Sequence, residues 1–256
     1  MPNAAVPVRA RNDPGQYDDL TDEWWLPYGK MAALHWMARS RAALIPPPPY
    51  PGAVLLDVAC GAGLLAPYLN GPDQIEELAG WRHAGIDLSE LSLRQARAHG
   101  VASARADAVR LPFADASLHC VVAGEILEHV PDLEAACAEL ARVLAPGGVL
   151  VIDTMNDTWF CRVFLIRIAE HVPGGPPPGI HDPALLVDPE RLRGLLAAHG
   201  VRLGALIGLR PSALDMVGWL LHRREQVRMI RFGWTAGVYQ GIATKNDGDL
   251  RARGSR

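Results

Sequence analysis

The sequence predicts an α/β fold in which a mostly parallel sheet carries helices on both faces. Short apolar runs alternate along the chain with segments whose apolar residues recur at helical spacing, which is typical of parallel sheets. The first run, residues 54–58, leads directly into the turn Gly61-Ala62-Gly63, and a helical pattern follows. A buried strand that ends at glycines before a helix places backbone N–H groups at the carboxyl edge of the sheet. Open α/β sheets bind ligands at that edge.

The segment before this first strand divides into two parts. Residues 1–16 are polar and contain proline, so we expect a mobile N-terminal tail. Residues 17–45 have aromatic and apolar side chains at helical spacing and predict a helical cap. Its pair Trp24-Trp25 allows two interpretations, packing onto the domain or covering a ligand pocket. The four prolines at 46–49 then end the helix and lead the chain into the sheet.

Four further strands are predicted in the first part of the domain, over residues 83–87, 101–106, 119–123 and 149–152. The second strand ends at Asp87, and an acid at this position suits the paired hydroxyls of a ribose. The third is followed directly by Asp107. Ser89 is the expected N-cap of the helix after Asp87. Another helix, over residues 133–144, stops at Pro146-Gly147-Gly148.

The second part of the domain contains an insertion before its last strands. An apolar helix over 157–172 and a loop rich in Pro and Gly predict a lid over 157–185. A helix over 190–199 follows, and then strands over 201–209 and 238–244 separated by a helix over 213–230. We therefore expect one domain over 17–245, with a disordered charged tail over 246–256.

The composition excludes several classes of protein. An apolar fraction of 49% with 21% charged residues predicts a soluble globular protein with a large core. The net charge of −3 argues against nucleic-acid binding through a general basic field. Four cysteines without CxxC spacing predict buried thiols in a reducing compartment. The chain shows neither a signal peptide nor an apolar run of eighteen residues, so we expect a cytoplasmic protein.

Four motifs in this order resemble one known class. The segments DVACGAG, GIDLS, ADAVRLPFADASLHCVV and LAPGGVLVI match, in order and spacing, class I S-adenosylmethionine-dependent methyltransferases. Three further segments are similar to the UbiG branch, the O-methyltransferases of ubiquinone biosynthesis. These are GEILEHV, the tryptophan pair with Leu34-His35, and GIHD followed by PERL. The resemblance implies a Rossmann-like sheet of seven strands whose last strand is inserted antiparallel.

The resemblance also implies a site for the methyl donor, S-adenosylmethionine. Asp57 would orient the glycine loop and reach the amino-acid end of the donor, Asp87 would accept from both ribose hydroxyls, and Asp107 would accept from the adenine amino group. The complete set of expected donor-binding residues is Asp57, Gly61, Gly63, Asp87, Leu88, Asp107, Ala108 and Gly124.

A metal site is the next expectation. If the segment after the fourth strand opens a helix, Glu125, Glu128 and His129 lie near one face and can bind a divalent cation. The resemblance implies Mg²⁺, and a cation that chelates a catechol would stabilise the phenolate. The alternative is that Glu128 and His129 cap the helix and pack beneath the donor. His181 is a candidate general base or a lid residue, and His129 is the candidate base if no metal binds.

The expected function is methylation of an oxygen on an aromatic small molecule of catechol or quinol type, including prenylated ones. Two alternatives stay open: carbon or nitrogen methylation of a specialised metabolite, and a donor-binding pseudoenzyme. The helix over 159–172 carries Arg162 and Arg167 among apolar residues. It fits an apolar substrate tunnel, peripheral contact with a membrane, or a core or homodimer interface.

Overall fold

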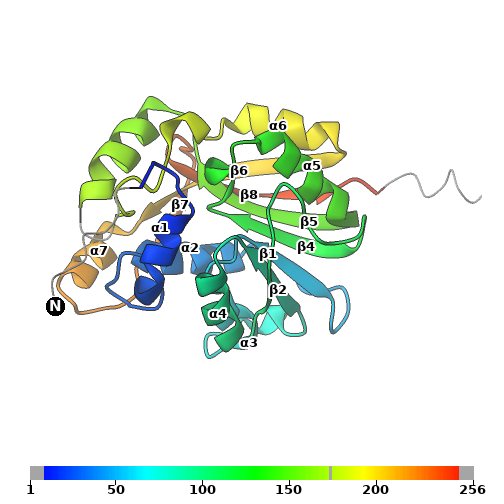
Figure 1. Ribbon diagram of the computed structural model, residues 1–256, viewed down its shortest axis with the longest axis horizontal. Helices are drawn as coiled ribbons and strands as arrows, with labels where there is room; N and C mark the ends of the chain where they lie inside the picture. The colour runs from blue at the N-terminus through cyan, green and yellow to red at the C-terminus, as the bar shows by residue number, and fades with distance from the viewer. Residues whose placement is uncertain (1–8, 173–174, 248–256) are drawn as a thin grey trace, which may run out of the picture.

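The computed structural model describes residues 9–172 and 175–247. It contains an α/β domain built on a single sheet (Figure 1). The predictions for residues 1–8, for 173–174 in the Pro- and Gly-rich loop, and for 248–256 of the tail lie outside the described residues. Residues 9–16, expected to be mobile, bond to the rest of the domain, for example from the Asn12 N–H to the Gly179 carbonyl at 3.1 Å.

The sheet has a parallel half and an antiparallel half. Its order is β3-β2-β1-β4-β5-β8-β6-β7, with parallel pairing from β3 to β5 and antiparallel pairing beyond β5. The strands are β1 (Val54–Val58), β2 (Arg82–Asp87), β3 (Ala102–Arg105), β4 (Leu118–Gly124), β5 (Leu144–Met155), β6 (Val201–Pro211), β7 (Met229–Phe232) and β8 (Val238–Lys245). The last strand is inserted antiparallel, as expected, but the described part of the chain forms eight strands where seven were predicted.

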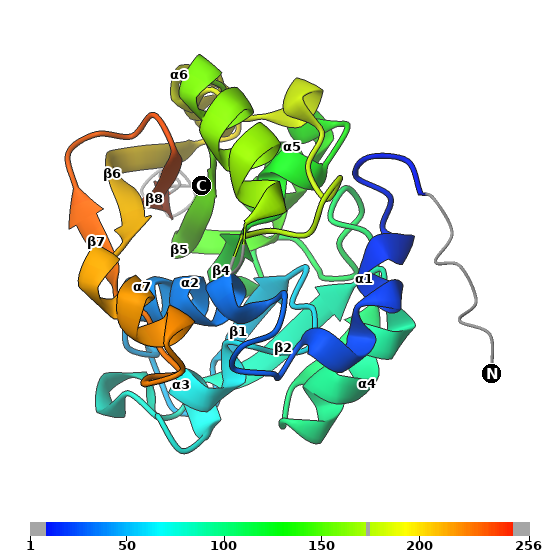
Figure 2. The ribbon, with the colours of Figure 1, turned by 90° about the vertical axis from the view of Figure 1, so that its left-hand side faces the viewer.

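Helices cover both faces of this sheet (Figures 1 and 2). The α-helices are α1 (Gly15–Asp19), α2 (Ala32–Ala42), α3 (Ala66–Asn70), α4 (Glu90–Ala98), α5 (Leu133–Val143), α6 (Pro189–Ala198) and α7 (Ala213–Leu220). The 3₁₀ turns are η1 (Thr21–Glu23), η2 (Glu76–Leu78), η3 (Leu127–His129), η5 (Ala169–His171) and η6 (Pro183–Leu185), and η4 (Cys161–Ile168) is a π-helix. Ser89 caps α4 as predicted, because its hydroxyl accepts from the Ser92 N–H at 3.0 Å.

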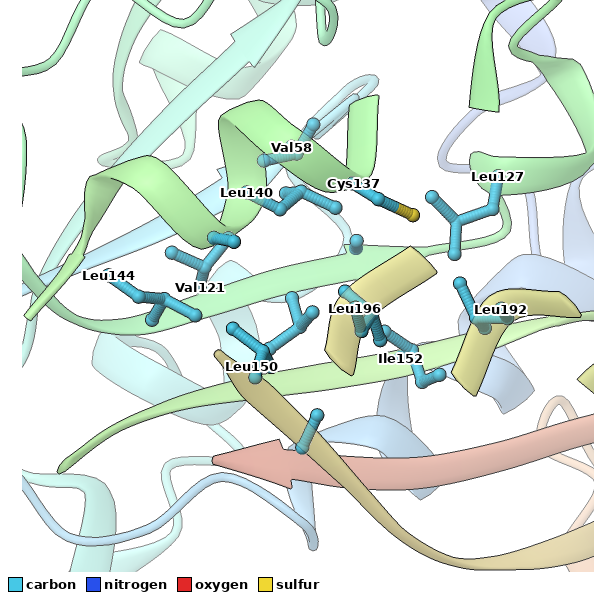
Figure 3. Close-up of a cluster of buried hydrophobic side chains, with 14 of the residues drawn as sticks. Val58, Val121, Leu127, Cys137, Leu140, Leu144, Leu150, Ile152, Leu192 and Leu196 are labelled. Atoms are coloured by element: carbon cyan, nitrogen blue, oxygen red, sulfur yellow. The ribbon is translucent and has the colours of Figure 1, made fainter. Parts of the chain in front are cut away.

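The core explains why the central strands are apolar throughout. Along β4, Val121 and Ala123 face the cluster beneath α5 and α6, whereas Cys120 and Val122 face the cluster beneath α2 and α3. Successive strand residues point to opposite faces, so a sheet covered on both sides needs apolar residues at every position. Figure 3 shows the α5 and α6 side, where Leu140 and Leu196 pack over the sheet. All four cysteines are free and buried, as predicted.

The extra strand comes from a segment predicted as helix. Residues 213–230 do not form one helix: α7 ends at Leu220, His222 has a left-handed backbone (φ 53°), and the chain returns as β7 along β6. Asp215, in the first turn of α7, accepts from the Arg228 N–H at 3.3 Å and from its Nε at 2.7 Å. This buried carboxylate holds the chain that enters β7 against α7. A tertiary contact therefore overrides the local helical pattern.

Candidate functional site

A cavity of about 730 Å³ opens at the carboxyl ends of the parallel strands. One half is formed by the loops after β1, β2, β3 and β4. The other half is formed by apolar side chains from α2, residues 165–172 and 175–181, α7 and the antiparallel half of the sheet. Among them are Met155, Leu165, Ile180, Met216, Met229 and Val238. A polar half beside an apolar half suits a polar nucleotide-like group next to an apolar molecule.

The structure brings nearly all of the expected donor-binding residues into the polar half. Those that line the cavity are Asp57, Gly61, Asp87, Leu88, Asp107, Ala108 and Gly124. Gly63 lies behind the loop, where an added Cβ would come within 2.9 Å of Val101 and 3.1 Å of Ala96. Gly63 therefore allows the loop to pack closely against α4. It also has a left-handed backbone (φ 83°), which glycine adopts readily.

Asp87 is the centre of the polar half. Its two carboxylate oxygens accept from the Gly61 N–H at 2.9 Å and from the Ser89 N–H at 2.8 Å. Burial raises the pKa of Asp87, as does the charge of Asp57, although these two hydrogen bonds lower it. The carboxylate therefore joins the glycine loop to the start of α4 and still faces the cavity.

The glycine loop is covered by the N-terminal helical segment. An added Cβ on Gly61 would lie 2.6 Å from the ring of Trp24, so only glycine lets this indole lie against the backbone. Trp24 lines the cavity, whereas Trp25 stacks on His99 with ring centroids 3.7 Å apart. Both interpretations of the tryptophan pair therefore apply, one to each residue. Trp24 covers the ligand pocket, and Trp25 packs onto the domain.

The candidate metal ligands do not converge. After β4 the chain does not open an α-helix: Glu125 has a left-handed backbone (φ 52°) and only the short turn η3 follows. The Glu128 carboxylate is fully buried and accepts from the Thr154 hydroxyl at 2.7 Å, while Glu125 and His129 line the cavity. Within residues 9–172 and 175–247, no three His, Cys, Asp or Glu side chains are grouped as a metal site requires.

The same carboxylates are strongly perturbed by their surroundings. Burial raises the pKa of Glu125, and so do the charges of Glu128 and Asp153, while Arg41 opposes them. Burial also raises the pKa of Glu128 against the hydrogen bond from Thr154. Without a cation, both carboxyls are therefore shifted toward their neutral forms.

A buried ion pair, missed in the sequence, closes the floor of the cavity. Arg41 on α2 donates to both Asp153 oxygens at 2.7 and 2.6 Å, and both side chains are almost fully buried. An added Cβ on Gly124 would overlap the Arg41 guanidinium, so glycine at the end of β4 makes room for it. The pair fastens α2 to β5 through a bidentate contact. An arginine near the end of a helix gives no sequence signal of such a partner.

Two histidines lie where the two halves of the cavity meet. The His129 and His181 rings stack with centroids 5.2 Å apart. Burial lowers the pKa of His129 to about 3, helped by the charge of His181, so His129 is neutral. Its Nδ1 lies 2.5 Å from the Asn12 side-chain oxygen, and its Nε2 lies 3.4 Å from the Tyr17 hydroxyl. Asn12 and Tyr17 were not expected from the sequence.

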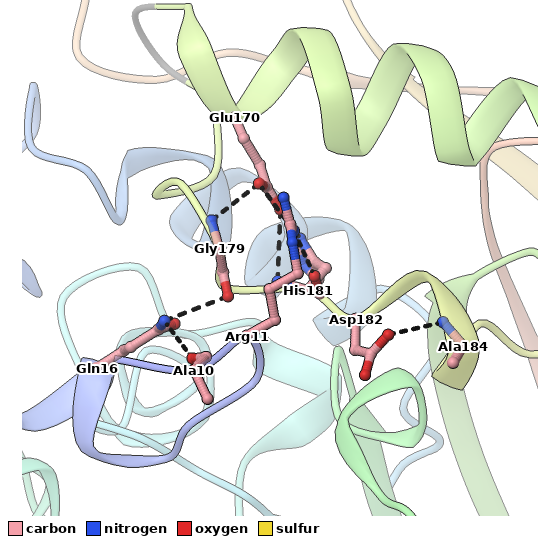
Figure 4. A network of polar contacts seen from close by, with 8 residues as sticks. All are labelled: Ala10, Arg11, Gln16, Glu170, Gly179, His181, Asp182 and Ala184. Atoms are coloured by element: carbon pink, nitrogen blue, oxygen red, sulfur yellow. Dashed lines mark hydrogen bonds and ion pairs between the residues drawn. The ribbon is translucent and has the colours of Figure 1, made fainter. Parts of the chain in front are cut away.

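His181 has different partners, shown in Figure 4. Its Nδ1 lies 3.4 Å from Glu170 of η5, and its backbone carbonyl accepts from Arg11 at 2.8 Å. Glu170 is almost completely buried, although it follows an apolar helix next to a loop rich in proline. A single acid at the end of an apolar segment could have indicated a buried, partnered carboxylate, but this signal was not used in the sequence analysis.

The residues of the polar half fit the methyl donor. Glycines and acidic side chains line a cavity large enough for a nucleoside joined to an amino acid. A family model described as a methyltransferase domain matches residues 56–152. With the parallel sheet and this cavity, these features define a class I S-adenosylmethionine-dependent methyltransferase.

Relatives of known function narrow this class. The ubiquinone biosynthesis O-methyltransferase of Thiobacillus denitrificans is 30% identical over 210 residues, covering 79% of this chain and 88% of that protein. The enzyme of the same name from Idiomarina loihiensis is 33% identical, covering 82% and 86%. The chain therefore belongs to the family of the ubiquinone biosynthesis O-methyltransferases, the UbiG family.

Solved structures agree on the fold. A methyltransferase from Thermotoga maritima aligns with a TM-score of 0.60 and 18% identity, covering 90% of this chain and 96% of that one. The [4+2]-cyclase SpnF aligns with a TM-score of 0.58 and 19% identity, covering 96% and 100%. At this identity the likeness concerns the fold alone. The protein is an S-adenosylmethionine-dependent methyltransferase that acts on a small-molecule acceptor.

Proposed function

We propose that this enzyme methylates a hydroxyl of a catechol- or quinol-type aromatic molecule, including those with an apolar prenyl tail. The observation that carries the proposal is the cavity itself, in which a polar half adjoins an apolar half and two histidines lie at the junction. The names of the relatives, O-methyltransferases of ubiquinone biosynthesis, support oxygen as the methylated atom.

In this proposal the polar half holds the donor. Asp87 accepts from the ribose hydroxyls, Asp107 and Ala108 face the adenine, and Asp57 faces the amino-acid end. Gly61 and Gly124 line the cavity beside the donor, and Trp24 covers it. The donor supplies a methyl group already activated on a sulfonium. The remaining task of the chain is to align the acceptor and to receive its hydroxyl proton.

His181 is the better candidate for the proton acceptor. Both ring nitrogens of His129 face polar groups of the N-terminal segment, and its lowered pKa makes it a weak base. His181 lines the cavity with a carboxylate on one side of its ring. The apolar half, in which Met155, Met216 and Met229 line the cavity, accepts the aromatic ring and its tail.

The resemblance to UbiG also implies Mg²⁺, but the candidate ligands as arranged here do not fit it. One oxygen of Glu128 accepts from Thr154, and His129 Nδ1 lies against Asn12. In the part of the chain that the structure describes, no three His, Cys, Asp or Glu side chains are grouped closely enough to hold a metal ion. Our proposal therefore contains no step that depends on a cation.

The test is methyl transfer from labelled S-adenosylmethionine to a panel of catechols, quinols and amines, with and without EDTA, with products identified by mass. We expect a methyl ether from catechols or quinols, at equal rates with and without EDTA. Carbon or nitrogen methylation, or donor binding without any product, would contradict the proposal and favour the alternatives. Activity lost in EDTA and restored by Mg²⁺ would show that the acidic residues rearrange around a cation.

We further propose that the mouth of the apolar half contacts an anionic lipid surface. Trp159 (70% exposed) and Leu214 (76% exposed) belong to the two elements, residues 159–168 and α7, whose inner sides line the cavity. Exposed arginines lie close by, including Arg162, Arg224 and Arg228. Aromatic and aliphatic side chains next to arginines favour the membrane interface. In the described part of the chain, no helix is long and apolar enough to cross a bilayer.

A further inference from the structure

The strongest unexplained feature is the environment of Glu170, and what we infer from it rests on the function proposed above. Glu170 lies in η5 at 2% exposure, between the apolar residues Ala169 and Val172 that line the cavity. Burying a carboxylate is unfavourable unless hydrogen bonds and charges compensate. Its partners therefore indicate what the residue does.

The two oxygens of Glu170 have different partners (Figure 4). Oε2 accepts from the Gly179 N–H at 2.9 Å and from Arg11 Nη1 at 3.3 Å. Oε1 faces His181, with the backbone N–H at 3.4 Å and the ring Nδ1 at 3.4 Å. One oxygen is thus occupied by two donors that are always protonated. The other faces an imidazole nitrogen that can carry a proton or not.

The Glu170 carboxylate lies next to Nδ1 of the His181 ring. Nδ1 is buried and has no hydrogen bond to any residue in the described ranges, since 3.4 Å is slightly longer than a well-formed bond. A small rotation of the ring closes this distance. A neutral imidazole carries one proton, and a carboxylate beside Nδ1 favours the tautomer with the proton there.

We propose that Glu170 is a positioning residue that holds His181 in the Nδ1–H tautomer, so that Nε2, on the opposite side of the ring, receives the acceptor's proton. Arg11, from the segment before α1, holds the carboxylate in place and also bonds the His181 carbonyl. The arrangement of carboxylate, imidazole and acceptor follows the general logic of an oriented base.

The state of the carboxylate is consistent with this role. Burial by itself would raise the pKa of Glu170, but the contacts with His181, the Gly179 N–H and the charge of Arg11 lower it. Glu170 is therefore an anion at neutral pH and can only accept hydrogen bonds.

The substitution Glu170→Gln tests the tautomer directly. The amide oxygen is expected to take the Oε2 position, because two obligatory donors, Gly179 N–H and Arg11, face it there. The amide NH₂ then faces His181 Nδ1 and donates to it, so the proton of the imidazole moves to Nε2. Nitrogen-15 NMR of histidine-labelled protein distinguishes the two tautomers, with His181→Asn identifying the signal. We expect Nδ1–H in the parent protein and Nε2–H in Glu170→Gln. The same tautomer in both proteins would overturn the proposal.

Kinetics provide the second readout. We expect Glu170→Gln to lower kcat about 10- to 100-fold, with the KM of the donor and the affinity for S-adenosylhomocysteine within about twofold. Added to His181→Asn, it should cause no further loss, since it acts through that ring. Glu190→Gln, at a carboxylate whose side chain is 80% exposed, is the matched control and should change nothing. An additive loss in the double variant would contradict a role through His181.

The two measurements separate this inference from the proposed function. If His181→Asn keeps the parent kcat, His181 is not the proton acceptor and the mechanism above fails. The NMR comparison requires no turnover, so it still decides whether Glu170 controls the ring.

Discussion

Single side chains at the ends of the strands determine which ligand this sheet can hold. Asp57, Asp87 and Asp107 were expected at the cavity because they lie within or directly after apolar runs that resemble methyltransferase motifs, and all three line it. Strand ends are local features, so their side chains can be predicted. Asn12 and Arg41 were missed because their partners are far away in the chain. Asn12, for example, bonds the His129 carbonyl 117 residues further on. Glu170 was missed because its partners Gly179 and His181 lie on a loop whose path no local pattern predicts.

Asp87→Ala is expected to abolish donor binding. The carboxylate would accept from two ribose hydroxyls, and each hydrogen bond to a charged group contributes about 1.5–3 kcal/mol. We therefore expect the affinity for S-adenosylhomocysteine, measured by calorimetry, to fall about 100-fold or more. Asp73→Ala, at an exposed loop residue, is the control. Unchanged affinity in Asp87→Ala would show that the donor binds elsewhere.

Ala59→Gly should stabilise the protein. Ala59 has a left-handed backbone (φ 57°) in the loop after β1, a conformation that costs an L-residue about 1–2 kcal/mol. Glycine adopts it freely but adds about 0.5–1 kcal/mol of unfolded-state entropy, so the net gain is about 0.5–1 kcal/mol.

Urea unfolding measures this difference in free energy. The matched control is Ala62→Gly in the same loop, because Ala62 is buried and is not among the residues with positive φ. It should lose stability, since it adds the entropic cost of glycine and removes a buried methyl group without relieving any strain. Equal losses in both variants would mean that Ala59 is not strained.

Among the elements, those with strong periodicity were predicted well and those stabilised by distant contacts were not. α5 and α6 lie within a residue or two of the predicted ranges, because capping residues and an apolar face define both. The predicted helix over 157–172 is a π-helix followed by a 3₁₀ turn. The predicted helix over 213–230 splits into α7 and β7, since Asp215 and the β6 edge hold the second half.

Asp215→Asn tests that explanation through its pH dependence. The hydrogen bond from Arg228 and its charge, together with that of Arg224, lower the pKa of Asp215. A carboxyl whose pKa is lower in the folded than in the unfolded state stabilises the fold at pH values above the ordinary pKa of an aspartate. That contribution is lost as the pH falls through the lowered value.

The expected result is therefore a lower Tm for Asp215→Asn than for the parent protein at pH 7. The difference should shrink as the pH is lowered below about 4. Asp182→Asn, at a partly exposed N-cap, serves as the comparison. A difference that stays constant down to pH 3 would exclude the charge of Asp215 as the cause.

At the scale of the whole molecule, the layered architecture and the position of the cavity followed from the order of strands and helices alone. The shape of the apolar half did not. It is assembled from α2, residues 165–172 and 175–181, α7 and strands of the antiparallel half, which no local pattern brings together. α7 lies beside α2, where Trp36 meets Trp219 edge to face at 5.4 Å (Figure 2).

The proposed lipid contact belongs to this scale. We expect the protein to sediment with anionic vesicles at low salt, and less so as salt screens the arginines. Trp159→Ala combined with Leu214→Ala should weaken this partitioning about tenfold, because each change removes apolar surface from the interface. Tyr50→Ala is the control, since Tyr50 is 53% exposed in the loop before β1, at the amino ends of the parallel strands and therefore opposite the cavity.

Self-association through the same surface is the competing explanation. Size-exclusion chromatography without vesicles distinguishes the two explanations. If the parent protein is a dimer and the double variant is a monomer, this surface is a dimer interface and the proposed lipid contact is wrong.

The position of β8 has a consequence for how the chain is made. Residues 238–245 pair with β5 on one side and β6 on the other, so the sheet cannot be completed until residue 245 has left the ribosome. Synthesis proceeds at about 5–20 residues per second, so the nascent protein spends seconds with two unpaired strand edges. Unpaired edges recruit other chains. Expression of this enzyme should therefore depend on chaperones that shield the nascent chain until its last strand is inserted.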